Sequence, residues 1–341
     1  MKFSNIFFIA LAVFLSLGIL SCKKENDDDY LSFDGNIRFD YPKYVSSGET
    51  YTFKFAGLSR PDGGTFGVRW HVAPTMSVAD TVRRKDEPLT VPADFTFTIP
   101  DTLCTLTLTC YAFQDDYYSS YVQKEITIID PAKSLTGCDF SKAAGEFKDS
   151  RDDKTYPFVR AAGLDWMAKN LAYEGLGGMS YEQCDIMKHL FGMFYSWEDA
   201  MKACPDGWRL PSDSEWVALA KETNPDGSFY EYNTLKGVTG DWMADAYLNG
   251  GKLWDYWPDV KVTNRMGMNM LSAGYASSGK QGSYSFSGGG KYAAFWTGDE
   301  YADDLAVYRY FYDERPDVYV STASRDSFLM SVRCVRDVDQ K

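Results

Sequence analysis

Aromatic side chains gather in two glycine-rich stretches of the C-terminal half, 241–259 and 275–292, with Asp and Asn beside them. Flat rings on rigid loops can stack on the CH faces of sugar rings, while carboxylates and amides bind the hydroxyl groups. The alternative is that these rings cover a core that is poor in regular structure. The candidate ligand-binding residues are Trp242, Asn249, Trp254, Asp255, Tyr256, Trp257, Asp259, Tyr275 and Tyr284.

Motifs of known catalytic sites do not occur in the sequence. It contains no GxSxG, P-loop, HExxH or dinucleotide-binding pattern, and it has only two histidines, His71 and His189. No cysteine pair has the CxxC spacing of a metal site. Acidic pairs such as Asp303 with Asp304 carry little weight, because a chain with 48 acids contains such pairs by chance. We therefore expect no enzymatic activity and no catalytic residue.

The first 22 residues have the features of an export signal. Lys2 precedes an apolar run from Ile6 to Leu20, which is the length of a signal-peptide core and too short to span a bilayer comfortably. The run ends in Leu20-Ser21-Cys22, which resembles the bacterial lipobox. The resemblance implies cleavage after residue 21 and acylation of Cys22, for example by palmitate. The alternative is an ordinary secretory signal that happens to end in cysteine.

Residues 22–31 form an acidic, flexible tether, in which the stretch from Lys23 to Asp29 is charged and free of apolar residues. A lysine followed by acidic residues directly after the lipidated cysteine resembles the surface-export signal of Bacteroidetes lipoproteins. We therefore expect a protein anchored in outer-membrane lipid through Cys22 and exposed on the cell surface. The chain carries 35 basic and 48 acidic residues, a formal charge of -13, which argues against nucleic acid as a partner.

The 341 residues suggest two domains. Residues 32–131 show short runs of alternating polar and apolar residues, the pattern of half-buried strands in a β-sandwich. Trp70 and Cys110 on two of these runs are typical of immunoglobulin-like cores, so this part resembles the Ig-like or PKD-like modules of bacterial surface lipoproteins. Six extended residues separate Cys104 from Cys110 by about 20 Å, and we expect both to be buried free thiols.

Residues 132–341 contain four ordered blocks, which are LDWMAKNL (164–171), GMFYSWEDA (192–200), CPDGWRLPSDSEW (204–216) and SVRCV (331–335). Together they resemble the Fibrobacter succinogenes major paralogous domain of bacterial secreted and surface proteins. The resemblance implies a C-type-lectin-like α+β fold, with two helices beside a loop-rich, mostly antiparallel β core that is closed by an N- to C-terminal pairing. The chain differs from typical members in the long glycine-rich stretch 273–291 and in a single Cys184, where a pair is common.

Calcium binding has one weak indication. Asn224-Pro225-Asp226 is the nearest match to the Glu-Pro-Asn or Gln-Pro-Asp loop of calcium-dependent lectins. No Trp-Asn-Asp follows it, and Pro-Asp-Gly is ordinary turn chemistry. We therefore expect no cofactor and no metal, and calcium stays the weaker interpretation.

Two of the blocks also predict helix starts. Ser196 with Asp199, and Ser212 with Glu215, have the spacing of a capping box, in which a hydroxyl and an acid satisfy the free N–H groups of the first turn. We expect one helix after each serine. The residues predicted to face the core are Trp197, Ala200, Met201 and Cys204 on the first helix, and Trp216, Leu219 and Ala220 on the second.

Six cysteines remain once Cys22 is acylated, and an exported location permits disulfides. Cys204 and Cys334 both lie in the family-like blocks, so we expect a bridge between them. Cys138 with Cys184 is a looser second pairing. The alternative is that these are independent buried thiols.

Two functions are compatible with these features. The first is a non-enzymatic surface lipoprotein whose C-terminal lectin-like domain binds an extracellular ligand, glycan before other classes. The second is a structural or adhesin subunit that docks onto a protein partner in an envelope or pilus-like assembly. Stacking aromatics on a concave surface would favour the first function, and an exposed apolar patch would favour the second.

Overall fold

The computed structural model describes residues 33–74, 77–81, 94–114, 117–225, 234–254, 260–279 and 283–338. The predicted signal peptide, Cys22 and the tether lie outside these ranges. The described chain consists mostly of strands arranged in several sheets, which confirms the mainly β prediction. Among the described residues, no helix combines the length and the apolar character that crossing a membrane requires.

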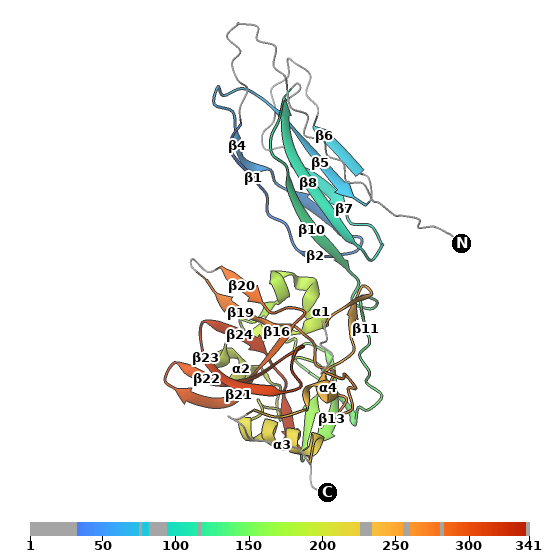
Figure 1. Ribbon diagram of the computed structural model, residues 1–341, viewed down its shortest axis with the longest axis vertical. Helices are drawn as coiled ribbons and strands as arrows, with labels where there is room; N and C mark the ends of the chain where they lie inside the picture. The colour runs from blue at the N-terminus through green and yellow to red at the C-terminus, as the bar shows by residue number, and fades with distance from the viewer. Residues whose placement is uncertain are drawn as a thin grey trace, which may run out of the picture.

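Ten strands lie in the described residues of the N-terminal part, which is blue to green in Figure 1. They are β1 (Asp34–Arg38), β2 (Tyr44–Ser46), β3 (Thr50–Phe53), β4 (Ala56–Ser59), β5 (Gly67–Ala73), β6 (Ser77–Thr81), β7 (Phe95–Thr98), β8 (Thr105–Gln114), β9 (Tyr117–Tyr118) and β10 (Val122–Ile129). One sheet has the order β2-β10-β8-β5-β6, with β9 paired to β8. Two ribbons, β1-β4 and β3-β7, complete this part.

Trp70 lies at the centre of the N-terminal core and is 1% exposed. Its ring stacks on Phe95 of β7 at 5.5 Å and meets Phe39 edge-on at 5.0 Å. Alternation along β8 buries every second side chain, as the period-2 pattern predicts. Cys104 and Cys110 are both free, as expected, although Cys104 is only partly buried.

The C-terminal part begins with the strands β11 (Leu135–Thr136), β12 (Gly145–Lys148), β13 (Thr155–Ala161), β14 (Leu164–Met167) and β15 (Met179–Ser180). The helical segment comprises the 3₁₀ turns η1 (Tyr181–Gln183) and η2 (Asp185–Met187), then α1 (Lys188–Phe191), β16 (Met193–Tyr195), α2 (Trp197–Ala203), α3 (Asp213–Thr223) and α4 (Thr239–Trp242). The remaining strands are β17 (Tyr247–Leu248), β18 (Gly251–Lys252), β19 (Tyr275–Ser278), β20 (Tyr284–Ser287), β21 (Tyr292–Ala302), β22 (Leu305–Tyr312), β23 (Val318–Ser324), β24 (Phe328–Ser331) and β25 (Val335–Asp337).

The last strand of this part pairs with one of its first strands. β25 lies beside β14, with Val335 opposite Trp166, in a sheet of order β12-β13-β14-β25. The larger sheet has the order β15-β16-β24-β21-β22-β23, with the β19-β20 hairpin attached to β24. Segments from near the two ends of the C-terminal part therefore lie in one sheet.

Both predicted helix caps form. The Ser196 side chain accepts a hydrogen bond from the Asp199 backbone N–H at the start of α2, and Ser212 and Glu215 make the complete reciprocal capping box at the start of α3. Trp216, Leu219 and Ala220 are buried as predicted. The prediction for Met201 is wrong, because this side chain is 47% exposed and the core position on the last turn of α2 belongs to Ala203.

A disulfide joins Cys204 to Cys334 and confirms the first predicted bridge. It connects the end of α2 to the segment that leads into β25. The second pairing is wrong, because Cys138 and Cys184 are free thiols. They lie in different surroundings: Cys138 is close to Lys169 and Arg333, whereas Cys184 is close to the backbone of β2.

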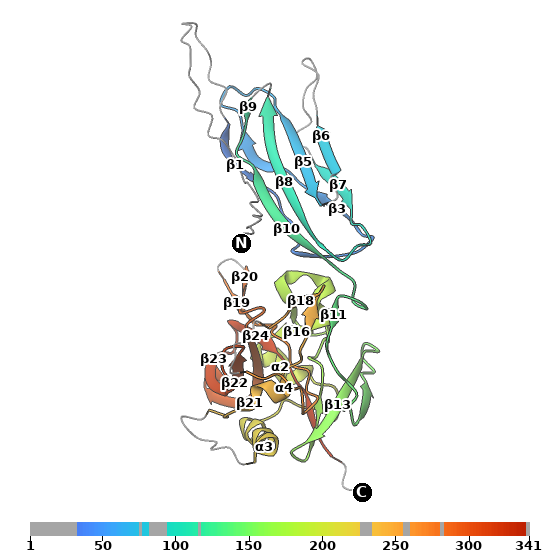
Figure 2. The ribbon, with the colours of Figure 1, turned by 45° about the vertical axis from the view of Figure 1, so that its right-hand side comes forward.

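The two parts of the chain follow one another along the long axis of the molecule (Figures 1 and 2). At the contact, Lys43 forms an ion pair with Glu182 at 2.7 Å, and the rings of Tyr44 and Tyr181 lie 5.8 Å apart. The Asn249 amide also donates a hydrogen bond of 2.8 Å to the Ile128 carbonyl, which ties the β17-β18 turn to β10.

Candidate functional site

A hollow of about 640 Å³ opens beside the β21-β22 hairpin. It takes side chains from β19, β21, β22 and β24, strands that lie on the outer side of the C-terminal part in Figure 1. We call it the tyrosine hollow, because most of its rings are tyrosines. Its lining consists of Tyr275, Ser287, Gly288, Lys291, Tyr292, Tyr308, Tyr310, Tyr312, Asp313, Glu314, Phe328 and Met330.

Alternation along β22 explains why the rings share one face. Successive side chains of a strand point to opposite sides, so Tyr308, Tyr310 and Tyr312 lie together. The opposite face carries Arg309 and Phe311, both buried; the Arg309 guanidinium contacts the carboxylate of Asp213 on α3 at 2.6 Å. One face of this strand therefore anchors the sheet to the core, and the other presents phenol rings.

Neighbouring rings of the hollow are in contact. Tyr292 stacks on Tyr310 with centroids 5.3 Å apart, and Tyr312 lies 5.1 Å from Tyr292. Tyr275 extends the row, at 5.5 Å from Tyr292 and 5.8 Å from Phe328. Mutual packing of this kind fixes ring orientation, so the surface is preformed.

The phenols of Tyr310 and Tyr292 remain neutral over the physiological pH range. Burial, with the neighbouring Tyr312 hydroxyl as a second cause, raises the pKa of Tyr310 to about 12. Burial raises the pKa of Tyr292 as well, and the adjacent Tyr308 adds to the shift. Each neutral hydroxyl can both donate and accept a hydrogen bond.

Charged groups occur at one end of the hollow, where Lys291, Asp313 and Glu314 contribute to the lining. Aromatic faces with polar groups at their edge match the surface of a polyhydroxylated ring, which has apolar CH groups and outward hydroxyls. Within the described ranges, no group of three His, Cys, Asp or Glu side chains has a geometry that could hold a metal ion. The arrangement suits reversible binding.

Two of the predicted binding residues lie inside the core. Trp242 and Trp254 are both 0% exposed. The Trp242 indole N–H donates to the Thr223 hydroxyl at 2.9 Å, and the Trp254 ring stacks on Phe311 at 5.7 Å. Neither ring presents a face to a ligand. Trp254 packs against the face of β22 that is opposite its tyrosines.

The other predicted residues have different locations. Tyr275 lines the tyrosine hollow, and Tyr284 lies partly buried on β20. The Asn249 side chain is used in the contact with Ile128 described above. Asp255, Tyr256, Trp257 and Asp259 lie outside the described residues, and so does Asp226 of the Asn224-Pro225-Asp226 turn.

Most rings of the hollow were not among the predicted site residues. The missing ones are Tyr292, Tyr308, Tyr310, Tyr312 and Phe328. The signal that could have found the three on β22 is tyrosine at every second position from 308 to 312, which places three phenols on one strand face.

The model of the Fibrobacter succinogenes major domain matches residues 159–336, which is more than half of the 341-residue chain. No curated protein and no solved structure shows significant similarity to this chain. The matched range contains the disulfide, both capped helices and every residue that lines the tyrosine hollow. The chain belongs to the Fibrobacter succinogenes major domain family.

Proposed function

We propose that this protein is a non-enzymatic surface lipoprotein that binds extracellular glycan in the tyrosine hollow. The supporting observation is the row of packed phenol rings, Tyr275, Tyr292, Tyr310 and Tyr312, with polar groups at its end. Sugars bind to such surfaces because ring stacking removes apolar CH area from water while the hydroxyls keep hydrogen-bond partners.

The proposal assigns separate roles to the two parts. The N-terminal strands would form an Ig-like or PKD-like spacer, anchored in the outer membrane through acylated Cys22. A single core around Trp70 supports an independent module there. The C-terminal part would be C-type-lectin-like, which the pairing of β14 with β25 and the two capped helices support.

The experiment is a glycan-array screen of residues 23–341, which retain every described residue, run with calcium and with EDTA. Saturable binding to a glycan class supports the proposal. Equal binding in EDTA would exclude a role for calcium at the Asn224-Pro225-Asp226 turn. A blank array under both conditions contradicts glycan binding and leaves a protein ligand as the next class to test.

A second candidate function is docking onto a protein partner in an envelope or pilus-like assembly. Three exposed tyrosines at the β8-β9-β10 turns favour it, since Tyr117, Tyr118 and Tyr121 are 49%, 58% and 66% exposed. Exposed rings near one another mark protein interaction surfaces. Photo-crosslinking from position 118 on intact cells tests it: a single crosslinked protein supports docking, and none contradicts it.

A further inference from the structure

A second hollow of about 410 Å³ lies elsewhere in the C-terminal part, between β13, the start of α1 and the loop that connects β18 to β19. We call it the basic pocket. Its charged lining consists of Lys154, Lys169, Lys188 and Arg333, together with His189. Among the residues that the structure describes, no aspartate or glutamate lines it, although the chain holds 48 acids against 35 basic residues. In a chain with an excess of acidic residues, four cationic side chains around one cavity are unexpected.

Arg333 carries a buried positive charge at this pocket. The side chain is 1% exposed, and its guanidinium donates to the carbonyls of Met167, Met268 and Asn269 and to the amide oxygen of Asn170, at 2.7 to 3.1 Å. In the described part of the chain no carboxylate pairs with it. Burial lowers its pKa, but arginine keeps its proton in proteins, so the charge remains.

Lys169 adds a second charge at the same place. This exposed lysine lies with its ammonium 5.0 Å from the centroid of the Phe140 ring, which also lines the pocket. Burial raises the pKa of the nearby Cys138 thiol, and the charges of Arg333 and Lys169 oppose that shift. The two cations therefore converge on one region of the cavity.

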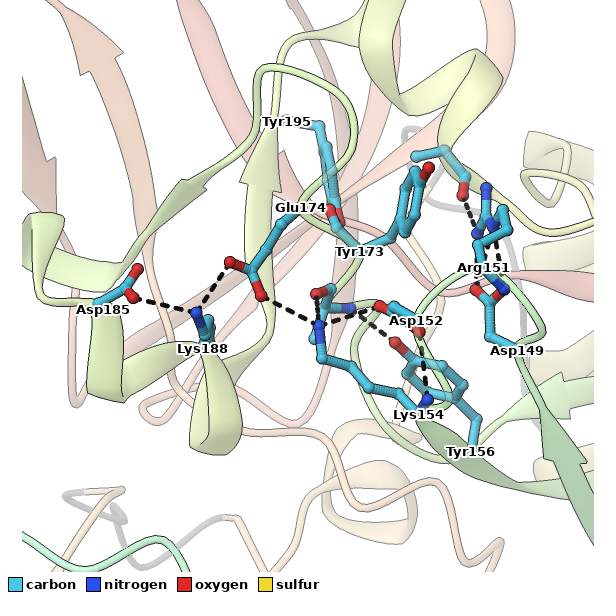
Figure 3. A network of polar contacts seen from close by, with 12 residues as sticks. Asp149, Arg151, Asp152, Lys154, Tyr156, Tyr173, Glu174, Asp185, Lys188 and Tyr195 are labelled. Atoms are coloured by element: carbon cyan, nitrogen blue, oxygen red, sulfur yellow. Dashed lines mark hydrogen bonds and ion pairs between the residues drawn. The ribbon is translucent and has the colours of Figure 1, made fainter.

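The other two lysines are held in place by acids outside the pocket (Figure 3). Glu174 accepts from both, at 2.8 Å from Lys188 and 3.2 Å from Lys154. Asp152 and Asp185 each add a contact of 3.0 Å. Such pairs fix the lysines at the wall and leave Lys169 and Arg333 as the positive charges without a carboxylate contact among the described residues.

We propose that the basic pocket binds a small organic molecule through an anionic oxygen head group, a carboxylate or a sulfate. The head group would lie against Lys169 on the side of the pocket that Arg333 lines, where its negative charge compensates the buried positive charge of Arg333. Phe140, Leu190 and Leu271 offer apolar surface for the body of the ligand. The volume lies within the range of small-molecule sites, and acid sugars and sulfated sugars have both parts.

His189 reports on occupancy. Burial lowers its pKa, and Lys188 and Lys154 lower it further, whereas Glu174 and Asp185 act in the opposite direction. A bound anion would favour the charged imidazole and raise this pKa. His71 is the only other histidine and lies on β5 of the N-terminal part, so it serves as an internal reference.

The test uses isothermal titration calorimetry of residues 23–341 with glucuronate, glucose 6-sulfate and uncharged glucose at constant ionic strength, with the histidine pKa values followed by NMR. We expect saturable binding of at least one charged sugar with a rise in the pKa of His189 but not of His71. Lys169→Met should weaken this binding about tenfold, equivalent to the loss of one charge-assisted contact. Lys202→Met on α2, outside the pocket, should not.

Any one of three results would overturn the proposal. These are glucose binding as tightly as both charged sugars, an unchanged dissociation constant in Lys169→Met, and equal pKa shifts at His71 and His189. Preference between glucuronate and glucose 6-sulfate identifies the head group. A Tyr310→Ala variant separates this proposal from the glycan proposal, because it should leave binding in the basic pocket intact.

Discussion

Tyr310 on β22 stands opposite Tyr319 on β23, and the two rings stack with their centroids 5.5 Å apart. Tyr292 of β21 also contacts Tyr310, with the ring centroids 5.3 Å apart. Tyr310 is therefore in contact with rings from both neighbouring strands. Cross-strand aromatic contacts of this kind stabilise a sheet and also hold each ring in one orientation.

Replacing Tyr310 tests whether ring stacking carries the proposed glycan binding. Tyr310→Ala should weaken binding of an array hit about tenfold, which corresponds to ~1.4 kcal/mol. Tyr310→Phe should change it less than threefold, because the ring remains. Tyr301→Ala is the matched control, since Tyr301 is 68% exposed and lies outside the hollow. Equal loss in Tyr310→Phe would show that the hydroxyl, not the ring, binds the ligand.

The disulfide between Cys204 and Cys334 should contribute substantially to stability, because it links positions 130 residues apart. A crosslink that closes a long loop restricts the unfolded chain, and its removal costs about 2–5 kcal/mol. We expect the Cys204→Ala/Cys334→Ala variant to lose that amount in urea unfolding followed by far-ultraviolet circular dichroism. Reductant should lower the stability of the natural chain by a similar amount and leave the variant unchanged. A natural chain that is insensitive to full reduction would contradict the prediction.

The helices and the disulfide could be predicted because their signals are local or lie within recognisable blocks. Ser212 and Glu215 meet across one helical turn, so their spacing alone indicates the cap. The exposure of Met201 could not be predicted from local spacing. Its helix has only seven residues, and which edge of a short helix is buried depends on the sheet it packs against.

The binding residues were harder to predict for a different reason. Trp242 and Trp254 occur in glycine-rich sequence that is typical of exposed loops, but the chain folds back over them and closes a core. The tyrosines of β22 show a clear period of two, which predicts a shared face. Whether that face is open depends on where the distant segment 275–292 lies, and this is a property of the tertiary structure.

The capping box at α3 gives a prediction with a small, defined magnitude. The Ser212 hydroxyl accepts from the Glu215 N–H, and the Glu215 carboxylate accepts from the Ser212 N–H at 2.7 Å. Ser212→Ala should lower the free energy of unfolding by about 1 kcal/mol. Ser212→Thr keeps the acceptor and should lose less than half of that. Equal losses in the two variants would mean that the hydroxyl acceptor is not what stabilises the helix start.

Alkaline pH should destabilise the protein before its buried phenols ionise. The pKa of tyrosine is about 10 in an unfolded chain, whereas in the folded state burial raises the pKa of Tyr310 to about 12 and also raises that of Tyr292. Above pH 10 the unfolded state therefore releases protons that the folded state retains, and the free energy of unfolding falls. The stability that these neutral, buried phenols contribute is fully present below pH 10 and decreases as the pH approaches 12.

Urea unfolding midpoints between pH 8 and pH 11 measure this effect, and absorbance at 295 nm follows phenol ionisation in the folded protein. Tyr310→Phe removes one shifted phenol, so its midpoint should fall less steeply with pH than that of the natural chain. Tyr301→Phe is the matched comparison, because Tyr301 is exposed and lies outside the packed row of rings. If the unfolding midpoints of the natural chain and Tyr310→Phe change in parallel with pH, the packed row of rings does not disfavour the ionised phenol. Burial among the other rings would then not explain why these hydroxyls stay neutral.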